Sequence, residues 1–585
     1  MSEARPRSRS LGGLVAPLLL AGTVLAPTQA SGYAIPIHVE LARRALGNSG
    51  LSAPAAPLEL ATAAALRAAI DAYGRSDAAT KDAWTRRYPT PGAFDAFSEK
   101  RFLLLSPKSE VYGLDRSDPR LASGKTLLEI AALSTGHPDE DWRNRERLAY
   151  DDKRQPLQDR YGQAVPADPS LLNMGKLGAL SSQAHAHYGL PKIEFSSDPA
   201  VLKAEPRRFA VAAGWPSGPI VTLAAEMAQL HLDMALLAAL SDGPTARELS
   251  YYYAGAGFHY MEDVGNQIHT MQVGLYDFFE DAFIERLKLG LLTGGGYLGK
   301  MRSLASIGID IVTNHHVLSE ELTGKHFKAA LEGGGGDPAK QLLTAPLSDD
   351  PEFGKRLDEA LAKLGPSPER GEFALAITNA LIDVSSYEGD KVYRATMAIA
   401  DPALRTRHKT FNEEKDDPDA FLKPQSPQRD QDFVGFFALQ ERAFRRVGTA
   451  LRRWVALQEK AIAEAGTPEA KEALRKAVLG RLIKRQLGLL DEADARLQKY
   501  LADPPRNVTA PEHDPALLVV DLGLVALAKE LASNGVPTLM IDLAGTAQGT
   551  GRLDSPRTGQ RWDDEVRSAV HHMRDAGLRP CPLDR

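Results

Sequence analysis

Two pairs of side chains in the middle of the chain have the types and spacing of metal ligands. His259 lies four residues before Asp263, and His269 follows this pair. Further on, His316 lies four residues before Glu320. Side chains four residues apart on a helix project from the same face, so each pair can grip a single ion. Imidazole and carboxylate ligands without a thiol are typical of a hydrolytic zinc site that keeps an open position for water.

The histidine and cysteine content narrows what such a site can be. The chain has 585 residues, 14 histidines and one cysteine, Cys581, which excludes an internal disulfide and a multi-thiolate metal site. Ten of the histidines lie between His38 and His326, which places the candidate site in the first two thirds of the chain. One pair alone is typical of a surface ion pair or a buried histidine. Two pairs with further histidines upstream favour a metal site.

The overall composition is that of a globular protein. Hydrophobic residues make up 43% and charged residues 25%, which excludes a disordered chain and a polytopic membrane protein. The length predicts roughly two to four domains. The 70 basic and 76 acidic side chains give a net charge of −6, which argues against a protein built around a large nucleic-acid footprint.

The amino terminus has the pattern of a secretory signal. An apolar stretch at residues 11–26 lies between a basic segment and a run of small residues: Arg5, Arg7 and Arg9 before it, then Thr28, Ala30, Ser31 and Gly32. The apolar stretch is short for a membrane span, so cleavage after Ala30 or after Gly32 is expected, with an uncleaved anchor as the alternative. The mature protein is therefore expected to be secreted or periplasmic, with no transmembrane anchor.

Apolar residues recur at helical spacing along most of the remaining chain, which predicts a mainly α-helical fold. Expected helices cover residues 221–240, 245–264, 284–292, 304–322 and, as one or two long charged helices, 433–501. A polar, proline-bearing linker is expected at 406–432. The arginines between 442 and 453 are typical of a solvated helix face, and peripheral contact with an anionic membrane is the second interpretation.

The residues around the first pair resemble a known metal signature. The pattern is His259-Tyr260-x-x-Asp263-Val264-x-x-x-x-His269. It is similar to the signature of the bacterial zinc-dependent phospholipases C, whose metal scaffold is shared with the single-strand-specific nucleases of fungi and plants. His316 and Glu320 lie downstream, where that family places its next two ligands. The nucleases usually have Asp at the last position, so Glu320 favours the phospholipase branch.

Three upstream segments extend the resemblance. His187 begins the sequence His-Tyr-Gly-Leu-Pro, which is similar to the family's His-aromatic-x-x-Pro segment, and His185 is the competing candidate. Asp139 lies in an acidic Pro-Asp-Glu-Asp segment before it. Cleavage at the second signal site would free the α-amino group of Tyr33, five residues before His38. The family uses a free amino terminus of this kind as a metal ligand.

The resemblance implies three zinc ions and a ligand set for each. The first would be held by Asp139, His187, His259 and Asp263, the second by Tyr33, His38 and a bridging Asp263, and the third by His269, His316 and Glu320. A metal-bound hydroxide would attack phosphorus in line, and Asp139 is the alternative general base. The sequence departs from the family at Gln267, where the family usually has Pro, and at Glu262, where it has Gly or Thr.

We therefore expect an exported zinc-dependent phosphodiesterase of the phospholipase C type that hydrolyses phospholipids, with Asp139 and Asp263 as catalytic residues. A signal peptide at 1–32 would precede a phospholipase C-like catalytic domain at 33–405, and a helical region of unknown role would occupy 433–585. A single-strand nuclease or 3′-nucleotidase is the alternative on the same scaffold, and nucleic acid is expected as a partner only in that case. A further alternative is a non-catalytic, metal-containing binding protein whose C-terminal helices recruit a partner.

Overall fold

The computed structural model describes residues 35–90, 124–136, 138, 187–189, 224–270, 318–330, 347–402 and 417–502. Within these ranges the chain is mainly helical and has no β-strand, which confirms the expected mainly α class. Two isolated β-bridges join Pro54 to Thr126 and Ala400 to Leu422. The expected helix at 284–292 lies outside the described residues.

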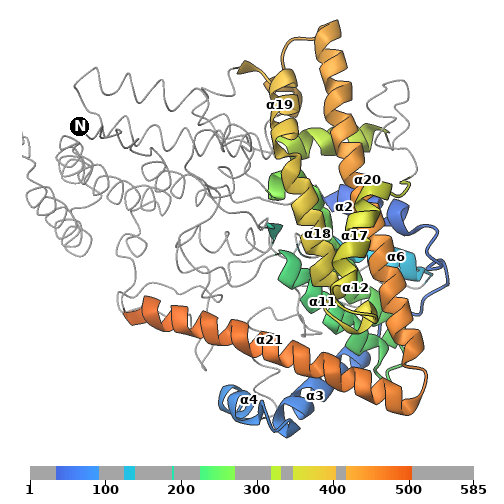
Figure 1. Ribbon diagram of the computed structural model, residues 1–585, viewed down its shortest axis with the longest axis vertical. Coiled ribbons are helices and arrows are strands. Elements are labelled where there is room, and N and C mark those ends of the chain that lie inside the picture. The colour runs from blue at the N-terminus through green and yellow to red at the C-terminus, as the bar shows by residue number, and fades with distance from the viewer. Residues whose placement is uncertain are drawn as a thin grey trace, which may run out of the picture.

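Two neighbouring helices form the centre of the fold (Figure 1). Helix α11 (Ala224–Ala239) packs along α12 (Ala246–Gly265), and the turn between them carries the Ser-Asp-Gly-Pro sequence that ends the first helix. Both helices match the expected ranges of 221–240 and 245–264 to within three residues. Every residue of α12 from Leu249 to Gly265 is buried. Such a helix must be covered by other helices on all sides.

The helices that cover this pair come from both ends of the described chain. They are α2 (Ile35–Leu46), α6 (Leu127–Ser134), α18 (Phe373–Tyr387) and α20 (Pro427–Glu464) around α12, with α3 (Leu60–Ser76) and α21 (Pro468–Ala502) against α11. The remaining elements are α4 (Lys81–Arg87), α17 (Pro351–Ala362), α19 (Gly389–Ile399) and the short 3-10 helices η4 (Gln267–His269), η6 (Pro368–Arg370) and η8 (Pro418–Phe421). Residues 318–330 are also helical. Segments far apart in sequence therefore share one core.

Local sequence signals define where several of these helices begin. Thr126 and Glu129 form a reciprocal capping box at the start of α6. The Asp350 carboxylate accepts hydrogen bonds from the first backbone N–H groups of α17, and Ser426 does the same for α20, where Pro427 takes the first helical position. Such caps satisfy donors that a helix leaves unpaired at its amino end.

Helix α20 belongs to the same packed core as the helices before it. It begins at Pro427, inside the stretch expected to be a linker, and packs on α2, α12, α18 and α19. Its Trp454 is fully buried and meets the ring of Phe258 on α12 edge-on, with ring centroids 5.2 Å apart. Helix α20 therefore shares its buried residues with the central helices, and the domain boundary expected near residue 405 stays a prediction.

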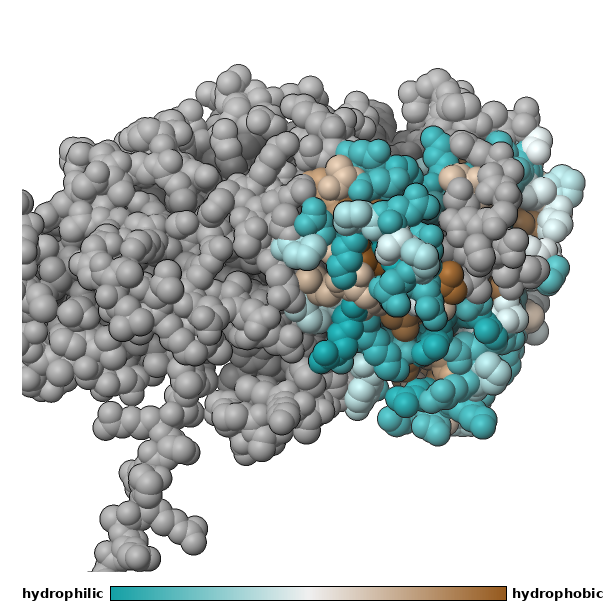
Figure 2. Space-filling model, turned by 90° about the horizontal axis from the view of Figure 1, so that it is seen from above, coloured by the Kyte–Doolittle hydropathy of each residue, from teal (hydrophilic) through white to brown (hydrophobic). Residues whose placement is uncertain are grey.

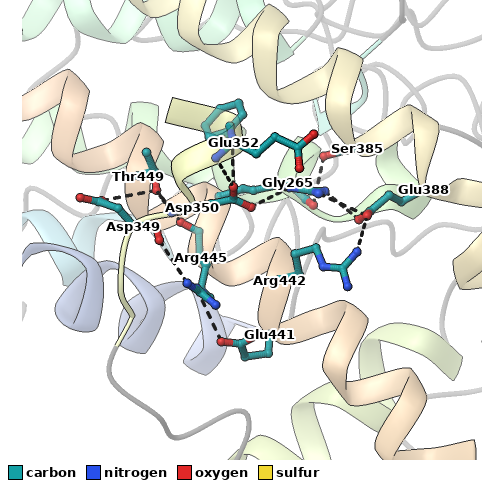
Figure 3. Close-up of polar contacts among 12 residues, drawn as sticks. Gly265, Asp349, Asp350, Glu352, Ser385, Glu388, Glu441, Arg442, Arg445 and Thr449 are labelled. Atoms are coloured by element: carbon teal, nitrogen blue, oxygen red, sulfur yellow. Dashed lines mark hydrogen bonds and ion pairs between the residues drawn. The ribbon is translucent and has the colours of Figure 1, made fainter. Parts of the chain in front are cut away.

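The arginines of α20 are paired with acidic side chains of neighbouring segments (Figure 3). Arg442 Nη1 lies 3.0 Å from Glu388 Oε1. Arg446 Nη1 lies 2.7 Å from Glu388 Oε2. Arg452 Nη2 lies 2.6 Å from Asp349 Oδ1. These pairs bind α20 to the α18–α19 corner and to the segment before α17. Membrane contact by this arginine stretch stays a prediction.

The surface of the described part of the chain is largely hydrophilic on the face seen in Figure 2, with smaller hydrophobic patches between the polar side chains. Among the described residues we found no helix with the length and apolar character needed to span a bilayer.

The close approach of α12 and α6 depends on a glycine. A Cβ atom placed on Gly255 would lie 2.1 Å from the carbonyl oxygen of Ala131, a backbone atom that cannot move aside alone. Gly435 on α20 is exposed and has no atom within 4 Å of the same position, so it provides a matched control.

We expect Gly255→Ala to lower the free energy of unfolding by about 1–3 kcal/mol, because the added methyl forces the two helices apart. Gly435→Ala should instead raise it by about 0.5–1 kcal/mol, since alanine has the higher helix propensity. Urea denaturation followed by circular dichroism measures both. Equal stability of the two variants would show that the helices do not depend on this contact.

Candidate metal centre

Four buried side chains from three separate segments meet at α12. They are His38 from α2, His187 from the segment 187–189, and His259 and Asp263 from α12 itself. All four are 0% exposed. His38, His259 and Asp263 each offer a ligand atom, and these atoms lie within 4.8 Å of one another. The group could hold a metal ion.

The two oxygens of Asp263 face different histidines. Oδ2 contacts His187 Nδ1 and lies 3.1 Å from His259 Nε2. Oδ1 lies 3.6 Å from His38 Nε2 and has no hydrogen-bond partner among the described residues. Burial by itself would raise the pKa of Asp263, but His259 and His187 hold that pKa well below its ordinary value. Asp263 is therefore a buried, ionised carboxylate with histidines on two sides.

A carboxylate lies near each ring nitrogen of His38, but only Nδ1 forms a hydrogen bond with one. Its Nδ1–H donates to Glu262 Oε2 over 2.7 Å, so the hydrogen of the neutral ring is on that nitrogen and the Nε2 lone pair faces Asp263. Burial, and then the neighbouring His259, lower the pKa of His38 well below 6.5, which favours the neutral ring. A lone pair that faces an ionised carboxylate is repelled by it unless a cation lies between them. The donor set thus fits a metal ion.

A second histidine–carboxylate pair adjoins the first group. His269 lies in η4, and its Nδ1–H donates to the backbone carbonyl of His187 over 2.8 Å. Its Nε2 lies 3.2 Å from Oε1 of Glu320, which is on the helical segment 318–330. A histidine that binds metal through one nitrogen usually donates its other N–H to a carboxylate or a backbone carbonyl. His38 and His269 both have this arrangement.

The short segment 187–189 is fixed by its neighbours on both sides. Gly189 N–H donates to the carbonyl of His269 over 3.0 Å, and the Tyr188 carbonyl accepts from the N–H of Ala224 over 3.0 Å. The Tyr188 ring stacks on the His269 ring with centroids 4.6 Å apart. These contacts hold His187 against α12. The segment 187–189 thereby connects the group around Asp263 with the His269–Glu320 pair.

The turn that carries His269 is tied to the later helices. The Gln267 side-chain amide donates to Glu388 Oε2 over 3.4 Å, and Glu388 is paired with Arg446 of α20. Ser385 of α18 donates to the carbonyl of Gly265, at the end of α12, over 3.3 Å (Figure 3). Gln267 therefore connects the histidine turn to the ion pairs of α20.

Six of the nine ligands expected from the sequence lie in the described part of the chain. The structure brings His38, His187, His259 and Asp263 together, and it places His269 against Glu320. Tyr33, Asp139 and His316 lie outside the described residues, as does His185, the alternative to His187. His187 itself reaches the candidate site.

Sequence reasoning identified Glu262 only as a departure from the family and missed its contact with His38. No sequence pattern reveals this contact, because Glu262 and His38 lie 224 residues apart. His231 on α11 is fully buried, donates through Nδ1 to the carbonyl of Met227 over 2.9 Å, and lies with its ring 5.4 Å from that of Tyr260. The sequence predicts that His231 packs in the core or lies on the surface, and its burial agrees with the first of these.

Comparisons of this chain with protein-family models, curated proteins and solved structures found no match.

The buried His231 predicts a specific pH dependence of stability. Burial lowers the pKa of His231 to about 3, although its bond to Met227 works in the opposite direction. In the unfolded chain this ring takes a proton near its ordinary pKa of 6.5, whereas the folded protein does not. Its contribution to stability is therefore present above pH 6.5 and is lost as the pH falls toward 3.

We expect His231→Gln to make the unfolding free energy less dependent on pH between about 6 and 4. The slope should decrease by about 1.4 kcal/mol per pH unit, the value for one proton, because glutamine does not titrate and can still donate to Met227. Urea denaturation of the chelator-treated protein at a series of pH values measures this slope. Data at pH 8 give the cost of the substitution itself, and parallel curves for the two proteins would contradict the prediction.

Proposed function

We propose that this protein is a zinc-dependent phosphoric-ester hydrolase of the phospholipase C type. The proposal rests on the surroundings of the two Asp263 carboxylate oxygens. His187 and His259 lie at one oxygen, and His38 faces the other. A carboxylate placed in this way is suited to being shared by two ions. It agrees with the bridging role that the resemblance implies for Asp263.

Each residue of the centre would have a simple task in such an enzyme. His187 and His259 would hold one ion with Asp263, His38 would hold a second, and His269 with Glu320 would contribute to a third. Bound zinc would neutralise phosphate oxygens and lower the pKa of a coordinated water. The ligand side chains are buried among packed helices, so little reorganisation would be needed when an ion binds.

The choice of phospholipid as substrate rests on the resemblance and on Glu320. The nucleases of the same scaffold usually have Asp at this position, and the structure places the Glu320 carboxylate 3.2 Å from His269. Single-stranded nucleic acid is the alternative substrate, and a metal-containing protein without catalysis is the alternative class. A direct test separates the three.

The first experiment is the zinc content of the purified protein after gel filtration, followed by substrate assays. We expect two to three zinc ions per chain and release of diacylglycerol from phosphatidylcholine vesicles. Hydrolysis of single-stranded DNA without hydrolysis of the lipid would assign the nuclease function instead. Bound zinc with neither activity would favour a binding protein. Absence of zinc, even after reconstitution with excess metal, would refute the metal centre.

Asp263→Asn tests the shared carboxylate. We expect it to lower zinc content by at least one ion and hydrolysis by at least about 100-fold, because the amide carries no charge to hold two cations. Asp233→Asn is the matched control, since Asp233 is equally buried but pairs with Arg481 and not with the histidines. That variant should keep its zinc. Full zinc content and activity in Asp263→Asn would exclude the proposed role.

A further inference from the structure

Glu262 and Asp263 are consecutive residues of α12, and both face the imidazole of His38. Glu262 is 0% exposed, and its Oε2 accepts from His38 Nδ1 over 2.7 Å. Asp263 Oδ1 lies 3.6 Å from the other ring nitrogen, Nε2. The ring therefore lies between two carboxylates. Glu262 accepts a hydrogen bond from it, whereas Asp263 lies too far from Nε2 for a hydrogen bond.

The acceptor at Nδ1 decides what the opposite nitrogen can do. A neutral imidazole has one N–H, and a carboxylate at 2.7 Å fixes that hydrogen on Nδ1. Nε2 then carries a lone pair in the direction of Asp263. Without an acceptor at Nδ1 the hydrogen could move to Nε2 and donate to Asp263, which would close the gap and remove a metal ligand.

Burial of Glu262 also indicates that the contact is specific. A carboxylate inside a helical core is unfavourable unless a polar partner compensates its loss of hydration. Glu248 is half-buried in the first turn of the same helix and accepts a hydrogen bond from the backbone N–H of Ala56 over 2.9 Å. Glu248 lies outside the histidine group and can serve as a control for changes at Glu262.

We propose that Glu262 is a positioning residue of the metal centre, which holds His38 in the Nδ1–H tautomer so that Nε2 is directed at the ion shared with Asp263. This inference rests on the metal centre of the proposed function. Glu262 acts through His38 and not on the substrate. Its removal should therefore weaken metal binding in a way that requires His38 to be present.

Two substitutions separate the hydrogen bond from the space that Glu262 fills. Glu262→Gln keeps an oxygen that can accept from Nδ1, and Glu262→Met keeps a similar volume without an acceptor. We expect Glu262→Met to lower the affinity for one zinc ion by about 10- to 100-fold and Glu262→Gln to lower it by clearly less. Competition with a chromophoric chelator measures the affinity. Glu248→Gln and Glu248→Met should match the wild type.

A double-mutant cycle with His38→Asn tests whether the effect passes through His38. In the His38→Asn background, Glu262→Met should cause no further loss of zinc affinity, because the ligand that Glu262 positions is absent. Circular dichroism and melting of the metal-free proteins confirm that each variant is folded, and Glu262→Gln provides the folded comparison if Glu262→Met is unstable.

The outcomes distinguish this inference from the proposed function. Wild-type zinc affinity in Glu262→Met, or equal losses in the Gln and Met variants, would overturn the positioning role and leave the metal centre intact. An undiminished effect of Glu262→Met in the His38→Asn background would overturn it as well. Failure of the wild-type protein to bind zinc would refute both the centre and the role of Glu262.

Discussion

The buried charge of Asp263 is the constraint on which the rest of this structure depends. An ionised carboxylate in a helical core is strongly unfavourable unless polar or cationic partners surround it. His259 comes from the same helix, one turn earlier, but His38 and His187 must be delivered from α2 and from the segment 187–189. The helices around α12 have to pack so that three separate pieces of chain reach one carboxylate.

The histidines reach Asp263 because the surrounding helices pack closely on α12. Small residues on α12 allow this close packing. A Cβ on Gly257 would lie 2.6 Å from the Trp454 ring, and one on Gly265 would lie 2.1 Å from Val447, both on α20. Helix α20 thus presses against the helix that carries His259 and Asp263. Through the ion pair of Arg446 it also reaches the turn of His269. Helix α20 therefore supports the candidate centre by packing on α12 and through the Arg446–Glu388–Gln267 contacts.

The sequence predicts the local parts of this arrangement well and the long-range parts poorly. The spacing of His259 and Asp263 on one face, and the bounds of α11 and α12, follow from helical periodicity. The contact of His38 with Glu262 spans 224 residues, and no periodicity reports it. Arg446 was expected on a solvated face because arginine-rich stretches usually are, yet its acidic partners Asp350 and Glu388 lie 96 and 58 residues away.

The tautomers in the centre link metal binding to folding. His38 and His269 donate their Nδ1 hydrogens to Glu262 and to the backbone of His187, so each directs Nε2 toward another carboxylate. This arrangement is organised by the packed helices and does not exist in the unfolded chain. An ion that binds there binds only the folded state, and its binding energy adds to the stability of the fold. The metal would thus relieve the repulsion that the folded chain itself creates around Asp263.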